Sequence, residues 1–206
     1  MAQNRPSFRR LSLFTHTGER KYLNGTERVR FLDALPVLSN PKDRTFCEML
    51  YWTGCRPSEA LALTATHIDL DEKLVILRSL KKRGDQKGRH FRPVPLPDAF
   101  IQRLERVHNI RAVQNGSRRG KALWSISRTT AWHRVRTVMR AAKITGIKAC
   151  GRGLRHAYGV HAATHDVPET RIKKWLGHES LETTEVYLDM AGPEDRKIAA
   201  RMWGKA

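Results

Sequence analysis

The sequence predicts a mostly helical α+β domain with one small antiparallel sheet. Apolar residues recur at helical spacing along most of the chain, which is the pattern of amphipathic helices. Two short apolar or alternating runs, at 69–80 and 90–97, interrupt that pattern and have the composition of a β-hairpin. The length of 206 residues, of which 40% are hydrophobic, suffices for one packed domain with or without a short arm.

The first part of the chain, residues 1–24, is basic and polar and has no sustained period. We interpret it as an arm that precedes a domain at 25–206. A helix is expected over residues 25–35, with Thr26 as its cap. The apolar side of this helix is expected to consist of Val29, Leu32 and Leu35.

Two further helices are expected before the hairpin. Residues 40–54 carry apolar side chains at helical spacing and end at Gly54, and Pro57 occupies a first-turn position of a helix over 57–64. Beyond the hairpin, residues 113–121 are expected to form an internal loop. The remaining expected helices span 98–110, 128–144, 153–165, 168–177, 181–190 and, at the C-terminal end, about 192–203.

The net charge indicates the kind of partner. Lys and Arg number 39 against 20 Asp and Glu, which gives a formal net charge of +19. A small domain with that excess repels itself unless a polyanion is its usual partner. Phosphate neutralisation by Lys and Arg supplies most non-specific affinity for nucleic acid, which is therefore favoured. An anionic membrane surface is the alternative, but no apolar run approaches the roughly 18–20 residues of a membrane span.

The three cysteines, Cys47, Cys55 and Cys150, do not have the number or spacing of a disulfide framework or of a usual zinc site. The opening residues MAQNRPSFRR lack the apolar stretch of a signal peptide. We therefore expect a protein of a reducing compartment, in the cytoplasm and associated with the nucleoid.

Two stretches in the first half of the chain have residues suited to phosphate. In TGCRPSEAL, Arg56 lies at a helix start, where the dipole favours anions, and Glu59 lies one turn later and can hold its guanidinium. The alternative for Arg56 is an ordinary surface arginine. The hairpin carries seven basic residues, which form either a solvated face or a finger that reaches a phosphate backbone. Its DNA-contacting candidates are Arg78, Lys82, Arg83, Lys87, Arg89 and Arg92, and one of Lys81 and Lys82 is expected to point into a site.

Two stretches in the second half complete the candidate site. In GRGLRHAYGVHA, Arg152 and Arg155 are three apart and share a helix face, with His156 beside them. In LGHESLETTEVYLD, His178 and Tyr187 are either packing residues or a nucleophile and its helper. A cation cluster with one tyrosine suits attack on a phosphodiester, because the cations stabilise the phosphorane and the phenol supplies the nucleophile. His161 and His165 are four apart, but no third ligand accompanies them, so no metal site is expected.

Taken in this order, the four stretches resemble the catalytic domain of the tyrosine site-specific recombinases, or phage-type integrases. The resemblance covers about residues 22–203. It implies that Arg56 and Arg155 clamp the scissile phosphate and that Tyr187 attacks it to form a 3′-phosphotyrosine. His178 would bond a non-bridging oxygen or assist proton transfer, and Glu59 would be a supporting residue. Lys81, or else Lys82, would act as general acid toward the leaving 5′ oxygen, with no metal or nucleotide cofactor.

The chain departs from the family pattern in two ways. The family usually has His or Lys three residues before the second arginine, where this chain has Arg152, a phosphate ligand that is a poor general base. The resemblance also implies an additional N-terminal helical DNA-binding domain of about a hundred residues, which this chain lacks the length to include beside a catalytic domain. The sequence is therefore interpreted either as a minimal recombinase with a short arm or as a fragment of a longer protein.

The resemblance also implies the partners. We expect a double-stranded DNA recombination site, a homotetramer on that DNA joined through the C-terminal helix, and a monomer or weak dimer when free. That helix can alternatively cover its own core. Accessory DNA-bending proteins are possible partners. The alternative functions are a type IB topoisomerase and an inactive DNA-binding relative that acts as a regulator.

Overall fold

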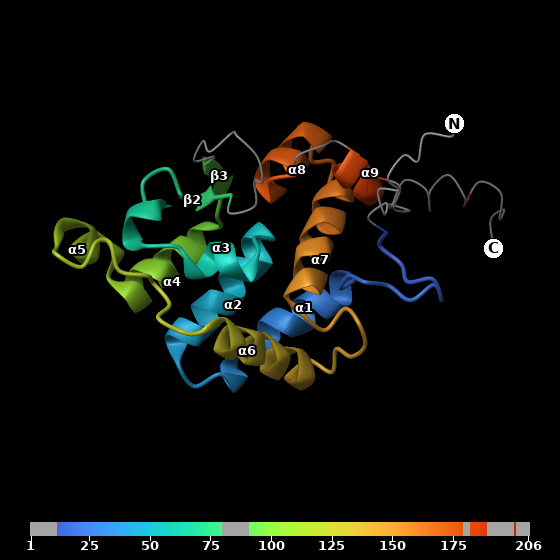
Figure 1. The fold of residues 1–206 in the computed structure, drawn as a ribbon, viewed down its shortest axis with the longest axis horizontal. Coiled ribbons are helices and arrows are strands. Elements are labelled where there is room, and N and C mark those ends of the chain that lie inside the picture. The colour runs from blue at the N-terminus through green and yellow to red at the C-terminus, as the bar shows by residue number, and fades with distance from the viewer. Residues whose placement is uncertain (1–11, 80–90, 179–181, 189–199, 201–206) are drawn as a thin grey trace, which may run out of the picture.

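The computed structural model describes residues 12–79, 91–178, 182–188 and Ala200. Its central element is helix α2 (Pro41–Thr53), around which other helices are arranged (Figure 1). The helix begins at Asn40, whose side chain accepts a hydrogen bond from the backbone N–H of Lys42 at 2.9 Å. It ends at Gly54, whose φ of 60° is the left-handed conformation that favours glycine. These two ends confirm the helix expected over 40–54.

Three other helices pack around α2 in the core: α4 (Asp98–His108), α6 (Arg128–Ala141) and α7 (Gly151–Ala163). In Figure 1, α4 and α7 lie on opposite sides of α2 and α6 lies beneath it. The apolar residues of α2 point toward all of these partners, so that Phe46 and Met49 are fully buried. A helix that is enclosed on several sides needs apolar residues around most of its circumference, as this one has.

The expected hairpin is present, and a short third strand extends it. Strands β1 (Ile68–Asp69), β2 (Leu74–Arg78) and β3 (Phe91–Pro95) form an antiparallel sheet in the order β1-β2-β3. Strand β3 lies at an edge, which suits its two prolines because they cannot donate ladder hydrogen bonds. The tip of the hairpin, 80–90, lies outside the described residues.

The N-terminal part of the chain differs from expectation. Of the segment interpreted as an arm, residues 12–24 pack onto the domain, because Leu13 and Leu23 are only 3% and 1% exposed. Helix α1 (Gly25–Asp33) is capped by Asn24 rather than Thr26, since Asn24 and Glu27 exchange side chain to backbone hydrogen bonds of 2.8 and 2.9 Å. The expected apolar side was also wrong in part, because Val29 is 57% exposed.

The other elements agree with the expected pattern, with one exception. Helix α5 (Ile110–Asn115) occupies part of the stretch expected to be an internal loop, and it is set off from α4 by Asn109 in the left-handed conformation. The C-terminal helix expected at about 192–203 lies outside the described residues, Ala200 excepted. The remaining elements are η1 (Leu35–Val37), α3 (Pro57–Leu61), η2 (Ala65–His67), α8 (Glu169–Leu176) and α9 (Glu182–Leu188).

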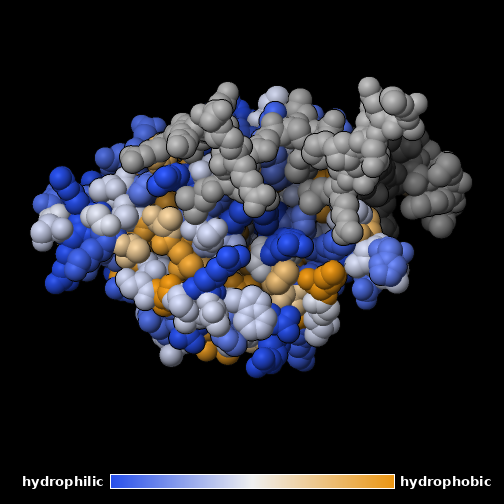
Figure 2. All heavy atoms as spheres, in the orientation of Figure 1, coloured by the Kyte–Doolittle hydropathy of each residue, from blue (hydrophilic) through white to orange (hydrophobic). Residues whose placement is uncertain are grey.

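The surface is consistent with the excess of basic residues. Figure 2 shows that the face in view is mostly hydrophilic, with hydrophobic side chains in small separate groups. Within the described ranges, no helix is long and apolar enough to span a bilayer.

Candidate functional site

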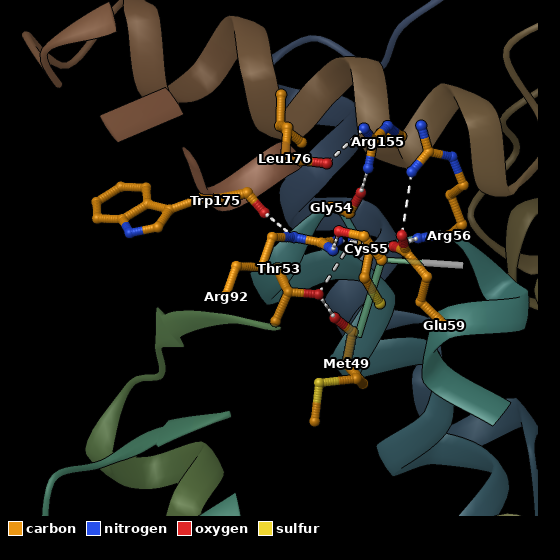
Figure 3. Close-up of polar contacts among 11 residues, drawn as sticks. Met49, Thr53, Gly54, Cys55, Arg56, Glu59, Arg92, Arg155, Trp175 and Leu176 are labelled. Carbon is orange, nitrogen blue, oxygen red and sulfur yellow. Dashed lines mark hydrogen bonds and ion pairs between the residues drawn. The ribbon is translucent and has the colours of Figure 1, made fainter. Parts of the chain in front are cut away.

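The turn after α2 places Arg56 at the start of α3, as Figure 3 shows. The hydroxyl of Thr53 donates to the carbonyl of Met49 at 2.6 Å and accepts from the N–H of Cys55 at 3.1 Å. These bonds hold the turn, so that the Arg56 side chain emerges from a fixed backbone. About a third of that side chain is exposed, which leaves it accessible to an anion from solvent.

Glu59 joins two arginines in the buried part of the site. One carboxylate oxygen lies 3.0 Å from Nη1 of Arg56, and the other lies 2.7 Å from Nη2 of Arg92. Burial alone would raise the pKa of Glu59, but the hydrogen bond and charge of Arg92, with Arg56, hold that pKa below its ordinary value. The carboxylate is therefore ionised at neutral pH, and it orients the Arg56 guanidinium as expected of a supporting residue.

Arg92 corrects a prediction. It was expected on the DNA-contacting surface of the hairpin, but its side chain is only 5% exposed. Besides Glu59, its guanidinium donates to the carbonyl of Trp175 at 2.9 Å and to the hydroxyl of Ser79 at 3.0 Å. The sequence contained a signal for this burial, because Arg92 is two residues from buried Val94 and side chains two apart share a face of a strand.

The second arginine of the site, Arg155 on α7, is also buried. Its guanidinium donates to the carbonyl of Gly54 at 2.9 Å and to the carbonyl of Leu176 at 2.7 Å, which joins α7 to the ends of α2 and α8. Burial and the nearby charge of Arg56 lower its pKa to about 10, so it remains a cation at neutral pH. Arg152, three residues earlier on α7, is exposed to solvent, whereas Arg155 is buried.

Tyr187 on α9 is enclosed by two histidines and a glycine. Its hydroxyl lies 3.1 Å from Nδ1 of His156, and its ring stacks at 5.9 Å on the ring of His178. Gly159 of α7 faces the Tyr187 ring, so the nearest turn of α7 presents no side chain there. Only 1% of Tyr187 is exposed, and His178 is held in turn by a hydrogen bond of 3.0 Å between its Nδ1 and the hydroxyl of Thr184.

The charge states of this group follow from burial among cations. Burial raises the pKa of Tyr187 to about 12, although Arg155 and Arg56 oppose that rise. Burial and the same two arginines lower the pKa of His178 to about 3, and burial with Arg155 and Arg152 lowers that of His156 to about 4. At neutral pH the site therefore contains two neutral histidines and a protonated phenol beside permanent cations.

We expect Gly159→Ala to displace Tyr187 and α9. A Cβ atom at position 159 would lie 2.7 Å from the Tyr187 ring, which is closer than real contacts allow. Overpacking of this kind costs about 1–3 kcal/mol, which exceeds the roughly 1 kcal/mol that alanine gains over glycine in a helix. Urea unfolding measures the loss, and Gly25→Ala is the control, because a Cβ there meets no atom within 4 Å. Equal effects of the two substitutions would contradict the prediction.

We expect the protein to lose stability as the pH falls from 6.5 toward 4. The pKa values of His156 and His108 are lowered from 6.5 to about 4, mainly by burial, so the unfolded chain binds protons in this window and the folded chain does not. Each such histidine costs up to about 3 kcal/mol over that range. Denaturant unfolding at several pH values measures the slope. His108→Gln should reduce the slope, whereas substituting exposed His133 should leave it unchanged; a flat profile in the unchanged protein would be evidence against the prediction.

His161 and His165, the two histidines considered above as metal ligands, lie next to each other on the surface. The rings of His161 and His165 lie 4.1 Å apart, and His165 interacts with the carbonyl of His161. Within the part of the chain that the structure describes, no three His, Cys, Asp or Glu side chains gather as metal ligands.

The structure thus brings Arg56, Glu59, Arg155, His178 and Tyr187 into one site. It adds two residues whose roles sequence reasoning missed, the buried Arg92 and His156. The only signal for His156 was its place beside Arg155, since its approach to the Tyr187 hydroxyl depends on how α9 packs against α7. Arg78 lies at the exposed end of β2. Lys81, Lys82, Arg83, Lys87 and Arg89 lie outside the described residues.

The fold is that of a tyrosine recombinase catalytic domain. The sequence model of the phage integrase family matches residues 21–192, and the chain belongs to this family. It is 32% identical over 183 residues to tyrosine recombinase XerD of Pseudomonas aeruginosa, covering 84% of this chain and 59% of that protein. It is 27% identical over 184 residues to tyrosine recombinase XerA of Thermococcus kodakarensis, covering 86% of this chain and 61% of that protein. The chain therefore spans about three fifths of the length of these relatives.

Solved structures share the fold. The crystal structure of XerA recombinase superposes with a TM-score of 0.70 at 21% identity, over 90% of this chain and 66% of that one. The XerH site-specific recombinase bound to its palindromic difH substrate, in a post-cleavage complex, gives 0.72 at 20% identity, over 89% and 53%. The catalytic domain of bacteriophage HP1 integrase gives 0.62 at 20% identity, over 87% and 93%. The last comparison covers nearly all of that catalytic domain.

Proposed function

We propose that this protein cuts and rejoins DNA at specific sites through a covalent bond between Tyr187 and a 3′ phosphate. The observation that carries the proposal is the meeting of three distant segments at one place. The turn at 53–56, the start of α7 and the α8–α9 region bring two arginines, two histidines and a tyrosine together. Membership of the phage integrase family supports the same chemistry.

The two arginines are suited to bind the scissile phosphate. Arg155 is fixed by the carbonyls of Gly54 and Leu176, and Arg56 is fixed by Glu59, so neither needs to reorganise when the phosphorane forms. Preorganised cations stabilise the charge that develops in the transition state more than they stabilise the bound substrate. Exposed Arg152 contributes a further phosphate contact.

The remaining roles complete the reaction. Tyr187 supplies the attacking oxygen, and neutral His178 donates a hydrogen bond from Nε2 to a non-bridging oxygen while Thr184 holds its Nδ1. Lys81, or else Lys82, protonates the leaving 5′ oxygen. The bond energy is kept in the phosphotyrosine, so rejoining needs no nucleotide, and the reaction needs no metal cofactor.

The proposed partner is a double-stranded recombination site, bound by the basic surface of the domain with contacts from Arg78 and the hairpin tip. The DNA substrate named for the XerH complex supports this choice of partner. On DNA we propose a homotetramer joined through the C-terminal helix, with accessory DNA-bending proteins, and a monomer or weak dimer in its absence. The protein would act in the cytoplasm, at the nucleoid.

The experiment is the capture of a covalent complex. The purified chain is incubated in EDTA with nicked duplexes cut from the DNA that flanks its gene, and the reaction is quenched in detergent. We expect a band of reduced mobility, and mass spectrometry of the digested complex should place the nucleotide on the peptide that contains Tyr187. Tight binding without a covalent band on any flanking duplex would instead favour a DNA-binding relative without strand cleavage. Relaxation of any supercoiled plasmid would favour a topoisomerase.

A further inference from the structure

The position that usually holds a proton acceptor is occupied by Arg152 in this chain. An arginine retains its proton at neutral pH and has no acceptor atom, so it cannot receive the phenol proton of Tyr187. The Arg152 side chain is also exposed to solvent, whereas Tyr187 is buried. Another group must therefore receive the proton when Tyr187 attacks.

His156 has the geometry for this task. It lies one residue beyond Arg155 on α7, and its Nδ1 is 3.1 Å from the Tyr187 hydroxyl, within the distance required of a general base. His178 is less well placed, because its ring lies parallel to the Tyr187 ring and its Nδ1 is occupied by Thr184. Among the described residues, His156 is the one titratable side chain with a hydrogen bond to the attacking oxygen.

We propose that Nδ1 of His156 accepts the proton of Tyr187 as the phenol oxygen attacks the DNA phosphate, an inference that rests on the function proposed above. The O–H bond of Tyr187 breaks as a bond from its oxygen to phosphorus forms. The bond from phosphorus to the 5′ oxygen then breaks, and that oxygen takes a proton from the hairpin lysine. His156 returns its proton to the tyrosine oxygen when the 5′ hydroxyl attacks in the rejoining step.

The electrostatics of the site allow this exchange. His156 is only 4% exposed, and Arg155, Arg152 and Lys21 lie near it, so it is neutral in the free protein and keeps its acceptor lone pair. A phosphodiester bound between the arginines offsets their positive charge and raises the proton affinity of His156 when the tyrosine attacks. The histidine thus becomes a stronger base once substrate is present.

One test examines the hydrogen bond without any DNA. In the tautomer that the proposal requires, the proton of the His156 ring is on Nε2 and Nδ1 is a bare acceptor. We expect ¹⁵N NMR of the ring at neutral pH to show an unprotonated Nδ1 whose resonance shifts in Tyr187→Phe. A spectrum with the proton on Nδ1 would overturn the proposal whether or not the chain cleaves DNA.

A second test measures the attack step. The substrate is a duplex with a 5′-bridging phosphorothiolate, whose sulfur leaves without a general acid. We expect His156→Asn, which places an acceptor oxygen near the position of Nδ1 but is not a base, to slow covalent capture by about 10²-fold, as loss of a general base does. Replacing Tyr187 with fluorotyrosine, whose phenol releases its proton more readily, should restore much of that rate.

The outcomes separate proton transfer from positioning. The same substitution at exposed His165 should leave capture unchanged. If His156→Asn reacts like the unchanged protein while His156→Leu is slow, His156 only positions the tyrosine and the proposal fails. A slow His156→Asn that fluorotyrosine does not restore also overturns it. A wild-type chain that forms no covalent complex on any duplex contradicts the proposed function instead, and the NMR result still decides the tautomer.

Discussion

Tyr187→Phe is expected to abolish covalent attachment to DNA while leaving the fold intact. The substitution removes the single oxygen that can form the phosphotyrosine, so the rate should fall by at least about 10³-fold, as for other nucleophiles. The ring remains to fill the space between Gly159 and His178, and the only hydrogen bond lost among the described contacts is the one to His156. Detergent-quenched gels with nicked duplexes measure the effect, and DNA binding is measured separately by mobility shift.

Tyr158→Phe is the matched control, because it removes the same hydroxyl from a half-buried tyrosine of α7 that is not one of the residues proposed to act on DNA. This variant should attach to DNA as the unchanged chain does. Covalent attachment by Tyr187→Phe would place the nucleophile elsewhere. Loss of DNA binding together with attachment would indicate that Tyr187 acts through the fold.

Glu59→Gln is expected to lower the free energy of unfolding by about 3–5 kcal/mol, the usual cost of removing one partner of a buried ion pair. The Glu59 side chain has no exposed surface and Arg92 has little, so the substitution leaves a buried guanidinium without a counter-charge. Arg56 also loses the carboxylate that orients it, so covalent capture should slow as well. Urea unfolding at pH 7 measures the first effect.

The pH dependence gives this prediction a second readout. Because the pKa of Glu59 is lowered in the folded state, its contribution to stability is present above the ordinary carboxyl range and is lost as the pH falls through the folded pKa. Glu59→Gln should therefore remove part of the acid destabilisation below pH 4.5, the ordinary value for this group. Asp71→Asn, which removes a carboxylate from an exposed ion pair with Arg111, should change neither stability nor its acid dependence. Equal effects of the two substitutions would show that the buried network is not stabilising.

The elements of the fold were largely predictable because local rules decide them. The N-cap Asn40, the apolar spacing along α2 and the left-handed Gly54 all act within a few residues of one another. Helix α5 and the cap of α1 were missed. The cap was a local signal, because Asn24 is followed three residues later by Glu27 and the two form a capping box. Helix α5 begins after Asn109, which adopts the left-handed conformation. Residues 12–24 were taken for an arm because their composition is polar, although a few buried apolar side chains suffice to hold such a segment on the core.

The sequence by itself determined which residues are proposed to carry the chemistry, because Arg56, Arg155, His178 and Tyr187 occur in motifs whose order and residue types suit a phosphodiester. Only the tertiary structure decided which polar side chains face one another. Arg92 belongs to a hairpin whose basic composition suits a DNA-contacting finger. Its side chain is nevertheless buried against Glu59, because the alternation of side chains along β3 turns it inward. His156 meets the Tyr187 hydroxyl because α9 packs on α7 over Gly159. Such contacts join residues 31 and 33 positions apart, and only the packing of whole helices and strands brings them within hydrogen-bond distance.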